Sequence, residues 1–244
     1  MLMRYGIFSD IHSNLEALEA VISAYKKESI DQYLCVGDIV GYAANPNECV
    51  MKTKEIIDGS VAGNHDRASV DLLSGAYFNP LAREAISWTK QNLNPESIKF
   101  LEPLKLIYKN KGLTLVHGTL NNPESFEYMS DVYIARESFS LLETLVCFVG
   151  HTHTPGIFTE DAAGGINYSR AALVSLKQDH KYIVNTGSVG QPRDGDPRAC
   201  YSIYDTDKKE VQIKRVAYNV DTAREKIIAA ALPQYLGDRL ITGS

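Results

Sequence analysis

This chain is built from short apolar runs, each of which stops at a polar residue. YGIFSD stops at Asp10, YLCVGD at Asp38 and SVAGN at Asn64, while LTLVH and LVCFVGH stop at His117 and His151. Runs of this length, rich in β-branched and aromatic residues, are typical of strands buried on both faces. The pattern therefore predicts buried strands that end in polar side chains.

Amphipathic segments separate these runs and predict helices. Residues 13–28 carry apolar residues at helical spacing, and Ser13 with Glu16 forms a capping-box pattern. Asn79 and Asn94 each precede a proline, as expected of an N-cap followed by the first helical position. We therefore expect helices to begin at these three places.

The last third of the chain changes character. Residues 199–218 alternate between apolar and polar and turn at DTDKKE, which predicts an antiparallel hairpin. Residues 221–236 predict a terminal helix that is interrupted or ended near Pro233. Strand–helix alternation followed by antiparallel strands predicts an α/β layered fold, and we expect a single domain over residues 1–244.

Composition narrows the classes of partner. The net charge of −5 argues against bulk nucleic-acid binding and against an acidic membrane surface, because both need clustered Lys and Arg. It does not argue against a small phosphorylated substrate if metal ions supply positive charge. The four scattered cysteines predict reduced core thiols, and no run resembles a signal peptide or a membrane span. We therefore expect a cytoplasmic protein.

The polar ends of the runs point to one shared site. Five of the six histidines lie at such ends, and His180 is the exception. Ligands of open α/β sheets bind where the carboxyl ends of strands converge. Each polar residue taken alone is explained by a turn or a helix cap. It is much less plausible that all five strand ends carry ligand-type residues by chance than that they form one site.

The donors at these ends are carboxylates, imidazoles and one amide, without a thiolate. Such oxygen and nitrogen donors suit Mn, Fe, Zn, Ni or Co. They are too many for one ion, and two-metal sites serve phosphatases and nucleases. The residues alone therefore indicate metal-assisted hydrolysis.

The motifs SDIH, GDIV, GNHD, HG and GHTH, in this order over residues 9–153, resemble the five-part signature of the calcineurin-like metallophosphoesterases. The segment NTGSVGQPRD, residues 185–194, is similar to a further stretch in the small bacterial and archaeal branch. The resemblance implies a four-layer α-β-β-α sandwich of two mixed β-sheets flanked by helices, with the site on one rim.

The resemblance also implies roles for single residues. Each of two metal ions would have three ligands of its own, and Asp38 would bridge both. The implied ligands are Asp10, His12 and His153 for the first ion and Asn64, His117 and His151 for the second.

His65 would be the catalytic histidine, protonated and donating to the leaving oxygen, and Asp66 would orient it. For Asp66 a simple helix or turn cap is an equal alternative. Arg193 is implied to hold a substrate phosphate, although Arg193 or Arg198 could instead pair with a neighbouring aspartate at the surface. The role of Arg198 stays open.

Function follows from the resemblance as an expectation. We expect a phosphodiesterase or dinucleoside polyphosphate hydrolase that uses a two-metal-activated hydroxide for in-line attack on phosphorus. The alternatives are a phosphomonoesterase or phosphoprotein phosphatase, and a non-catalytic protein-binding scaffold of the same fold.

The sequence does not identify the substrate, although a nucleotide is one candidate. It does not identify the metals either, and Mn, Fe, Zn and Ni are the candidates. We expect specificity to come from the loops at 42–58, 66–80, 118–133 and 154–180. The resemblance alone suggests a homodimer.

Overall fold

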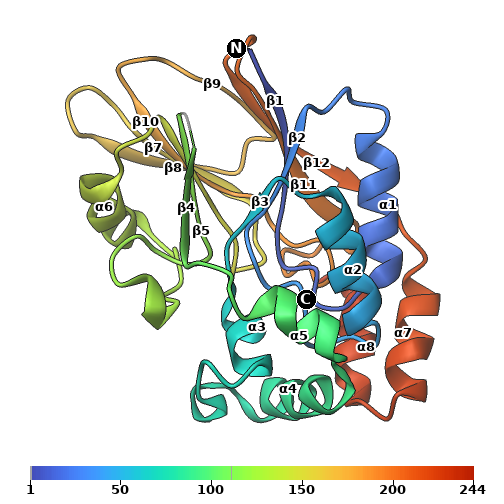
Figure 1. Ribbon diagram of the computed structural model, residues 1–244. Helices are drawn as coiled ribbons and strands as arrows, with labels where there is room; N and C mark the ends of the chain where they lie inside the picture. Colours follow the sequence, from blue (N-terminus) through green and yellow to red (C-terminus); the bar gives the residue numbers. More distant parts are fainter. Residues whose placement is uncertain (1, 111) are drawn as a thin grey trace.

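The computed structural model describes residues 2–110 and 112–244 and arranges them around two six-stranded sheets (Figure 1). Each sheet is mixed, because its parallel strands are extended by antiparallel ones. In order across the first sheet, the strands are β3 (Gly59–Ser60), β2 (Gln32–Cys35), β1 (Arg4–Phe8), β11 (Ala199–Asp205), β12 (Glu210–Val216) and β9 (Leu173–Ser175). Across the second they are β4 (Ile107–Asn110), β5 (Leu113–Val116), β6 (Val146–Val149), β10 (Lys181–Asn185), β7 (Gly156–Glu160) and β8 (Ile166–Ser169).

The two sheets pack face to face through one apolar layer. Ile7 and Leu34 of the first sheet share a buried cluster with Leu115, Phe148 and Val184 of the second. Removing such side chains from water is the main force that holds the layers together.

Helices cover the outer faces of both sheets. Four lie over the first sheet or beside it, and one lies over the second, where its Phe139 packs on Cys147 and Val149. They are α1 (Leu15–Tyr25), α2 (Pro46–Ile56), α5 (Pro95–Leu101) and α7 (Val220–Ala229) on the first side and α6 (Val132–Leu141) on the second. The predicted fold class, two mixed β-sheets flanked by helices, is confirmed.

The remaining helices lie near the carboxyl ends of the parallel strands. In Figure 1, α3 and α4 lie at the foot of the molecule, and α4 and α8 share a buried cluster with α7. Their bounds are α3 (Asn64–Ser69), α4 (Pro80–Asn92) and α8 (Gln234–Thr242), with 3₁₀ turns η1 (Gly75–Tyr77) and η2 (Pro123–Ser125) nearby.

Most predicted helix ends are confirmed, with one correction. Asn79 and Asn94 cap α4 and α5, and the terminal helix is interrupted at Pro233. The predicted capping box at Ser13 is wrong, because Asn14 caps α1 instead. Ser13 has a left-handed backbone (φ 58°), and its amide donates to the carbonyl of Ile39 in the neighbouring loop.

The four cysteines are free and buried, as expected of reduced core thiols. Within residues 2–110 and 112–244, every helix falls short of the length and apolar character needed to cross a membrane.

Candidate metal centre

The loops that follow β1, β2, β3, β5 and β6 meet at one rim of the sandwich and carry every predicted ligand. Backbone bonds tie these loops together, because the amide of Asp10 donates to Gly37 O (2.9 Å) and the amide of Gly150 donates to His117 O (3.0 Å). All seven predicted ligands are at most 8% exposed: Asp10, His12, Asp38, Asn64, His117, His151 and His153.

The backbone of this rim is strained where the ligands sit. Five of the seven have φ between 49° and 66°, a region that side chains other than glycine rarely adopt: Asp10, His12, Asp38, His151 and His153. Such strain is typical of functional sites, where the surrounding structure enforces it.

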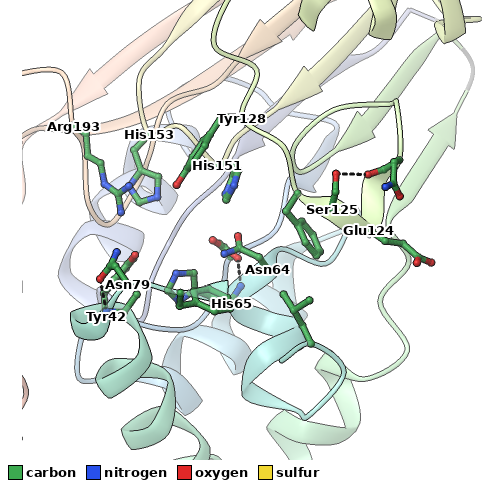
Figure 2. Close-up of a pocket in the computed structure, with 16 residues that line it drawn as sticks. Tyr42, Asn64, His65, Asn79, Glu124, Ser125, Tyr128, His151, His153 and Arg193 are labelled. Atoms are coloured by element: carbon green, nitrogen blue, oxygen red, sulfur yellow. Dashed lines mark hydrogen bonds between the residues drawn. The ribbon is translucent and has the colours of Figure 1, made fainter. Parts of the chain in front are cut away.

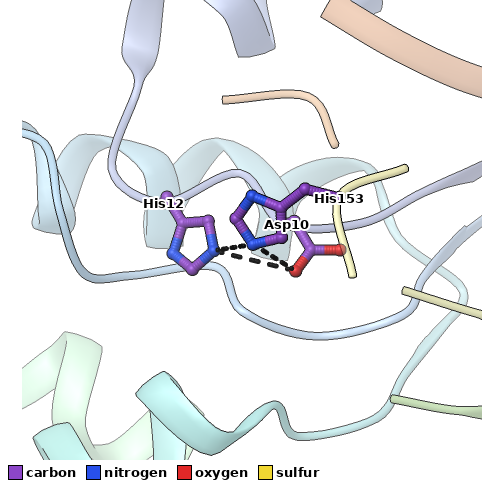
Figure 3. A group of neighbouring side chains, drawn as sticks. All are labelled: Asp10, His12 and His153. Atoms are coloured by element: carbon purple, nitrogen blue, oxygen red, sulfur yellow. Dashed lines mark hydrogen bonds and ion pairs between the residues drawn. The ribbon is translucent and has the colours of Figure 1, made fainter. Parts of the chain in front are cut away.

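Asp10, His12 and His153, hereafter the His12 group, lie close enough to share one ion (Figure 3). Nδ1 of His12 donates to Val40 O (3.1 Å) and Nδ1 of His153 to Gln191 O (2.6 Å), so each Nε2 of a neutral ring carries a lone pair. These two Nε2 atoms lie only 3.0 Å apart, and that of His153 lies 3.3 Å from Asp10 Oδ1. Lone pairs that face each other repel, and a cation bound between them would remove that repulsion. The geometry of the His12 group is therefore that of a metal site.

Asp38, His117 and His151, hereafter the His117 group, form a second cluster of donors. His117 Nδ1 donates to Val36 O (2.7 Å), which again turns Nε2 towards the carboxylate of Asp38 (3.2 Å). Asn64 Oδ1 is buried and has no hydrogen-bond donor among the described residues. Buried polar atoms are normally paired, so this amide oxygen is expected to have a partner, and a metal ion would provide one.

Asp38, a member of the His117 group, also lies within reach of the His12 group. Its Oδ2 lies 3.2 Å from Nε2 of His117 and 3.5 Å from Nε2 of His12. One carboxylate oxygen that reaches both groups has the placement of a ligand shared by two ions.

The pKa values of Asp38, His151 and His153 are shifted towards the unprotonated forms that bind metal. Burial alone would raise the pKa of Asp38, but His117 and His65 hold it well below its ordinary value. Burial lowers the pKa of His151 to about 3 and that of His153 to about 4. The pKa of His117 is shifted the other way: burial opposes its charge, but the Asp38 carboxylate beside it raises the pKa to about 10.

His65 lies beside these groups at the start of α3. Its amide donates to Asp38 Oδ1 (2.8 Å), and its ring packs against Tyr42 (centroids 4.4 Å apart) and Phe78 (5.0 Å). The start of α3 can lie this close to Asp38 only because residue 63 is a glycine: a Cβ on Gly63 would lie 2.0 Å from Asp38 Oδ1. The protonated form of His65 expected from the sequence is disfavoured, because burial lowers its pKa well below the ordinary value.

Asp66 makes different contacts from those expected of a residue that orients the His65 ring. Its carboxylate accepts from the amides of Gly63 and Asp38 and from those of the two residues after Asp38. None of the hydrogen bonds between described side chains joins it to the His65 ring. The predicted contact is therefore corrected in favour of the cap, which ties the loop after β2 to the start of α3.

A pocket of about 550 Å³ opens beside the clusters (Figure 2). Arg193 lines it, with its guanidinium 5.6 Å from the centre of the Tyr42 ring and its Nε without an acceptor among the described residues. Asp194 pairs with Arg215 instead.

Arg198 forms a surface ion pair with Asp196. Such pairing with a neighbouring aspartate is the alternative to substrate binding that the sequence left open. Sequence reasoning missed Arg239 on α8, which shares the Gln191 Oε1 acceptor with Arg193, at 3.1 and 2.8 Å. Nothing local in the sequence around Arg239 indicates this, because packing of the terminal helix creates the contact.

Comparisons with known proteins agree with this geometry. The family model of the calcineurin-like phosphoesterase superfamily domain matches residues 3–209. An uncharacterized protein of Methanocaldococcus jannaschii is 42% identical over 242 residues, covering 98% of this chain and 97% of that protein.

Two crystal structures are similar over their whole length. A metallophosphoesterase from Sphaerobacter thermophilus is 39% identical, with all of both chains covered and a TM-score of 0.88. A hypothetical protein from Pyrococcus horikoshii is 18% identical, with 99% of this chain and 98% of that chain covered and a TM-score of 0.79. The second likeness concerns the fold alone.

Proposed function

Because this chain belongs to the calcineurin-like phosphoesterase superfamily and is thus a hydrolase of phosphoric esters, we propose that it cleaves phosphodiesters or dinucleoside polyphosphates with two metal ions. The observation that carries the proposal is the position of Asp38 Oδ2, within 3.5 Å of both the His12 group and the His117 group. Both groups lie beside a pocket large enough for a substrate.

The His12 group would hold the first ion, Asn64 with His117 and His151 the second, and Asp38 both. Mn, Fe, Zn and Ni all accept these donors. Two cations held there would lower the pKa of a water for in-line attack on phosphorus and offset the charge of the phosphoryl oxygens.

The protein's own residues would bind and orient the ester. Arg193 lines the pocket with an Nε that has no acceptor among the described residues, and it would hold a phosphoryl oxygen by a charge-assisted bond. His65, neutral because it is buried, would donate an N–H to the leaving oxygen or to charge that develops in the transition state. Asp66 would act indirectly, by holding the loop that carries Asp38.

A panel of esters tests the proposal. Protein freed of metal by chelation is loaded with Mn, Fe, Zn, Ni or Mg in turn and assayed on bis(p-nitrophenyl) phosphate, diadenosine tetraphosphate and p-nitrophenyl phosphate. We expect at least one metal to support faster hydrolysis of the diester or the dinucleotide than of the monoester. Faster hydrolysis of the monoester with every active metal would contradict the proposed specificity.

A further inference from the structure

Apolar and aromatic side chains line the pocket beside the metal ligands. Its volume of about 550 Å³ is that of a site for a whole small molecule, and a phosphoryl group alone fills only a small part of it. We call this apolar part of the lining the ring slot, and its residues are Leu73, Phe78, Ala82, Phe126 and Tyr128. They come from the loops at 66–80 and 118–133 and from α4 next to the first of them.

The segment that carries Phe126 and Tyr128 is held in a strained form over the centre. Phe126 has φ 50°, which is unfavourable for a bulky residue; the residue is 7% exposed, and its ring centroid lies 6.0 Å from that of His117. The segment folds back over Gly118, where a Cβ would lie 2.7 Å from the carbonyl of Glu127. Rigid aromatic surface is thereby fixed beside the ligands.

Tyr128 offers an exposed aromatic surface in the ring slot. Its ring stacks on that of His151 (centroids 4.1 Å apart, planes at 10°), yet the residue remains 49% exposed. Phe78 lines the same pocket, edge-on to His65. Planar side chains arranged in this way bind flat rings by stacking.

Positive charge lies at one end of the pocket. Figure 2 shows Arg193 on one side, whereas the exposed Glu124 on the other side carries its carboxylate away from the metal ligands. Among the described lining residues, Arg193 is the one Lys or Arg, so an anionic group is favoured at its end.

From these contacts we propose that the ring slot binds a flat aromatic group carried on the reacting phosphate. The inference rests on the proposed function, since it places the phosphoryl group at the metal centre. Aryl esters and nucleoside esters share this chemistry.

Phosphonates test the slot by binding alone, because their P–C bonds resist hydrolysis. Calorimetric titration of Mn²⁺-loaded protein compares phenylphosphonate with methylphosphonate. We expect about tenfold tighter binding of the phenyl compound, as stacking on an aromatic side chain provides. A third probe, the P–C analogue of adenosine 5′-monophosphate, distinguishes the two sources: tighter binding than that of phenylphosphonate indicates a nucleoside ester, and weaker binding indicates an aryl ester.

Two variants and one matched control complete the experiment. Phe78→Ala brings the ratio of the phenyl and methyl affinities to within about twofold. Tyr128→Leu, at a half-exposed position whose change leaves the core intact, lowers the same ratio. Tyr133→Ala removes an 81% exposed tyrosine of α6 outside the pocket and keeps the ratio.

Failure of the slot differs from failure of the proposed function. Equal affinities of wild-type protein for both phosphonates would overturn the ring slot and leave the function in place. A tenfold ratio without hydrolysis of any ester would count against the function and not against the slot.

Discussion

At the scale of single residues, the chemistry of this protein depends on side chains whose neighbours fix them before any ligand arrives. His65 is an example, because its amide is bound by Asp38 and its ring lies between Tyr42 and Phe78. Preorganisation of this kind lets a group stabilise a transition state without reorganising during the reaction.

His65→Ala tests the role of that ring. We expect turnover to fall about 10²–10³-fold, since this is the usual contribution of one hydrogen-bond donor to developing charge, while both metals still bind. Steady-state kinetics and metal analysis after dialysis measure the two quantities. Near-native turnover would assign the donor role to another residue.

Arg193 and Arg198 form a matched pair on one loop. Arg193→Ala would remove the charge-assisted bond proposed between this residue and the substrate, and we expect the KM to rise about tenfold or more. Arg198→Ala removes only an exposed ion pair with Asp196, and the KM should stay within about twofold. Equal effects of the two substitutions would argue against substrate binding by Arg193.

At the scale of elements, the sequence predicts most of what local chemistry decides. The strands, the caps at Asn79 and Asn94 and the interruption at Pro233 follow from patterns within a few residues. The seven predicted ligands gather because motifs at strand ends necessarily meet at one rim.

Local sequence patterns do not predict the positions of side chains that are set by contacts with distant parts of the chain. Asp66 could not be assigned, because its partners lie in the loop after β2, on average about 27 residues earlier in the chain. Arg239 and the strained segment around Phe126 were missed for the same reason: contacts with other elements, rather than their own neighbours, give them their positions.

Substitutions of Asn94 test whether the predicted N-cap of α5 stabilises the fold. Its Oδ1 accepts from the amide of Ser97 (2.8 Å) at an exposed position. Asn94→Ala should lower the free energy of unfolding by about 1 kcal/mol, whereas Asn94→Asp, which keeps the acceptor, should not. Urea denaturation measures both, and equal stability of the two variants would show that the cap contributes nothing.

At the scale of the whole molecule, the centre joins the two sheets. Loops from β1, β2 and β3 of one sheet and from β5 and β6 of the other supply its donors, so a bound ion links both layers. The single domain and the homodimer suggested by the sequence stay predictions, as does the cytoplasmic location.

Metal should therefore stabilise the entire fold. A ligand at 100 times its Kd adds about 2.7 kcal/mol, which for a chain of this length raises the Tm by about 5–10 °C. Calorimetry with and without Mn²⁺ should show one transition that shifts as a unit. A transition that splits, with only one part responding to metal, would contradict both the single domain and the link between the sheets.

Anomalous diffraction from crystals grown with excess Mn²⁺ tests the paired centre most directly. For wild-type protein we expect two peaks about 3.5–4 Å apart, with Asp38 between them, and for Asp38→Asn we expect weakened occupancy of both. A single peak, or full occupancy of both positions in the variant, would contradict a shared carboxylate and with it the two-metal mechanism.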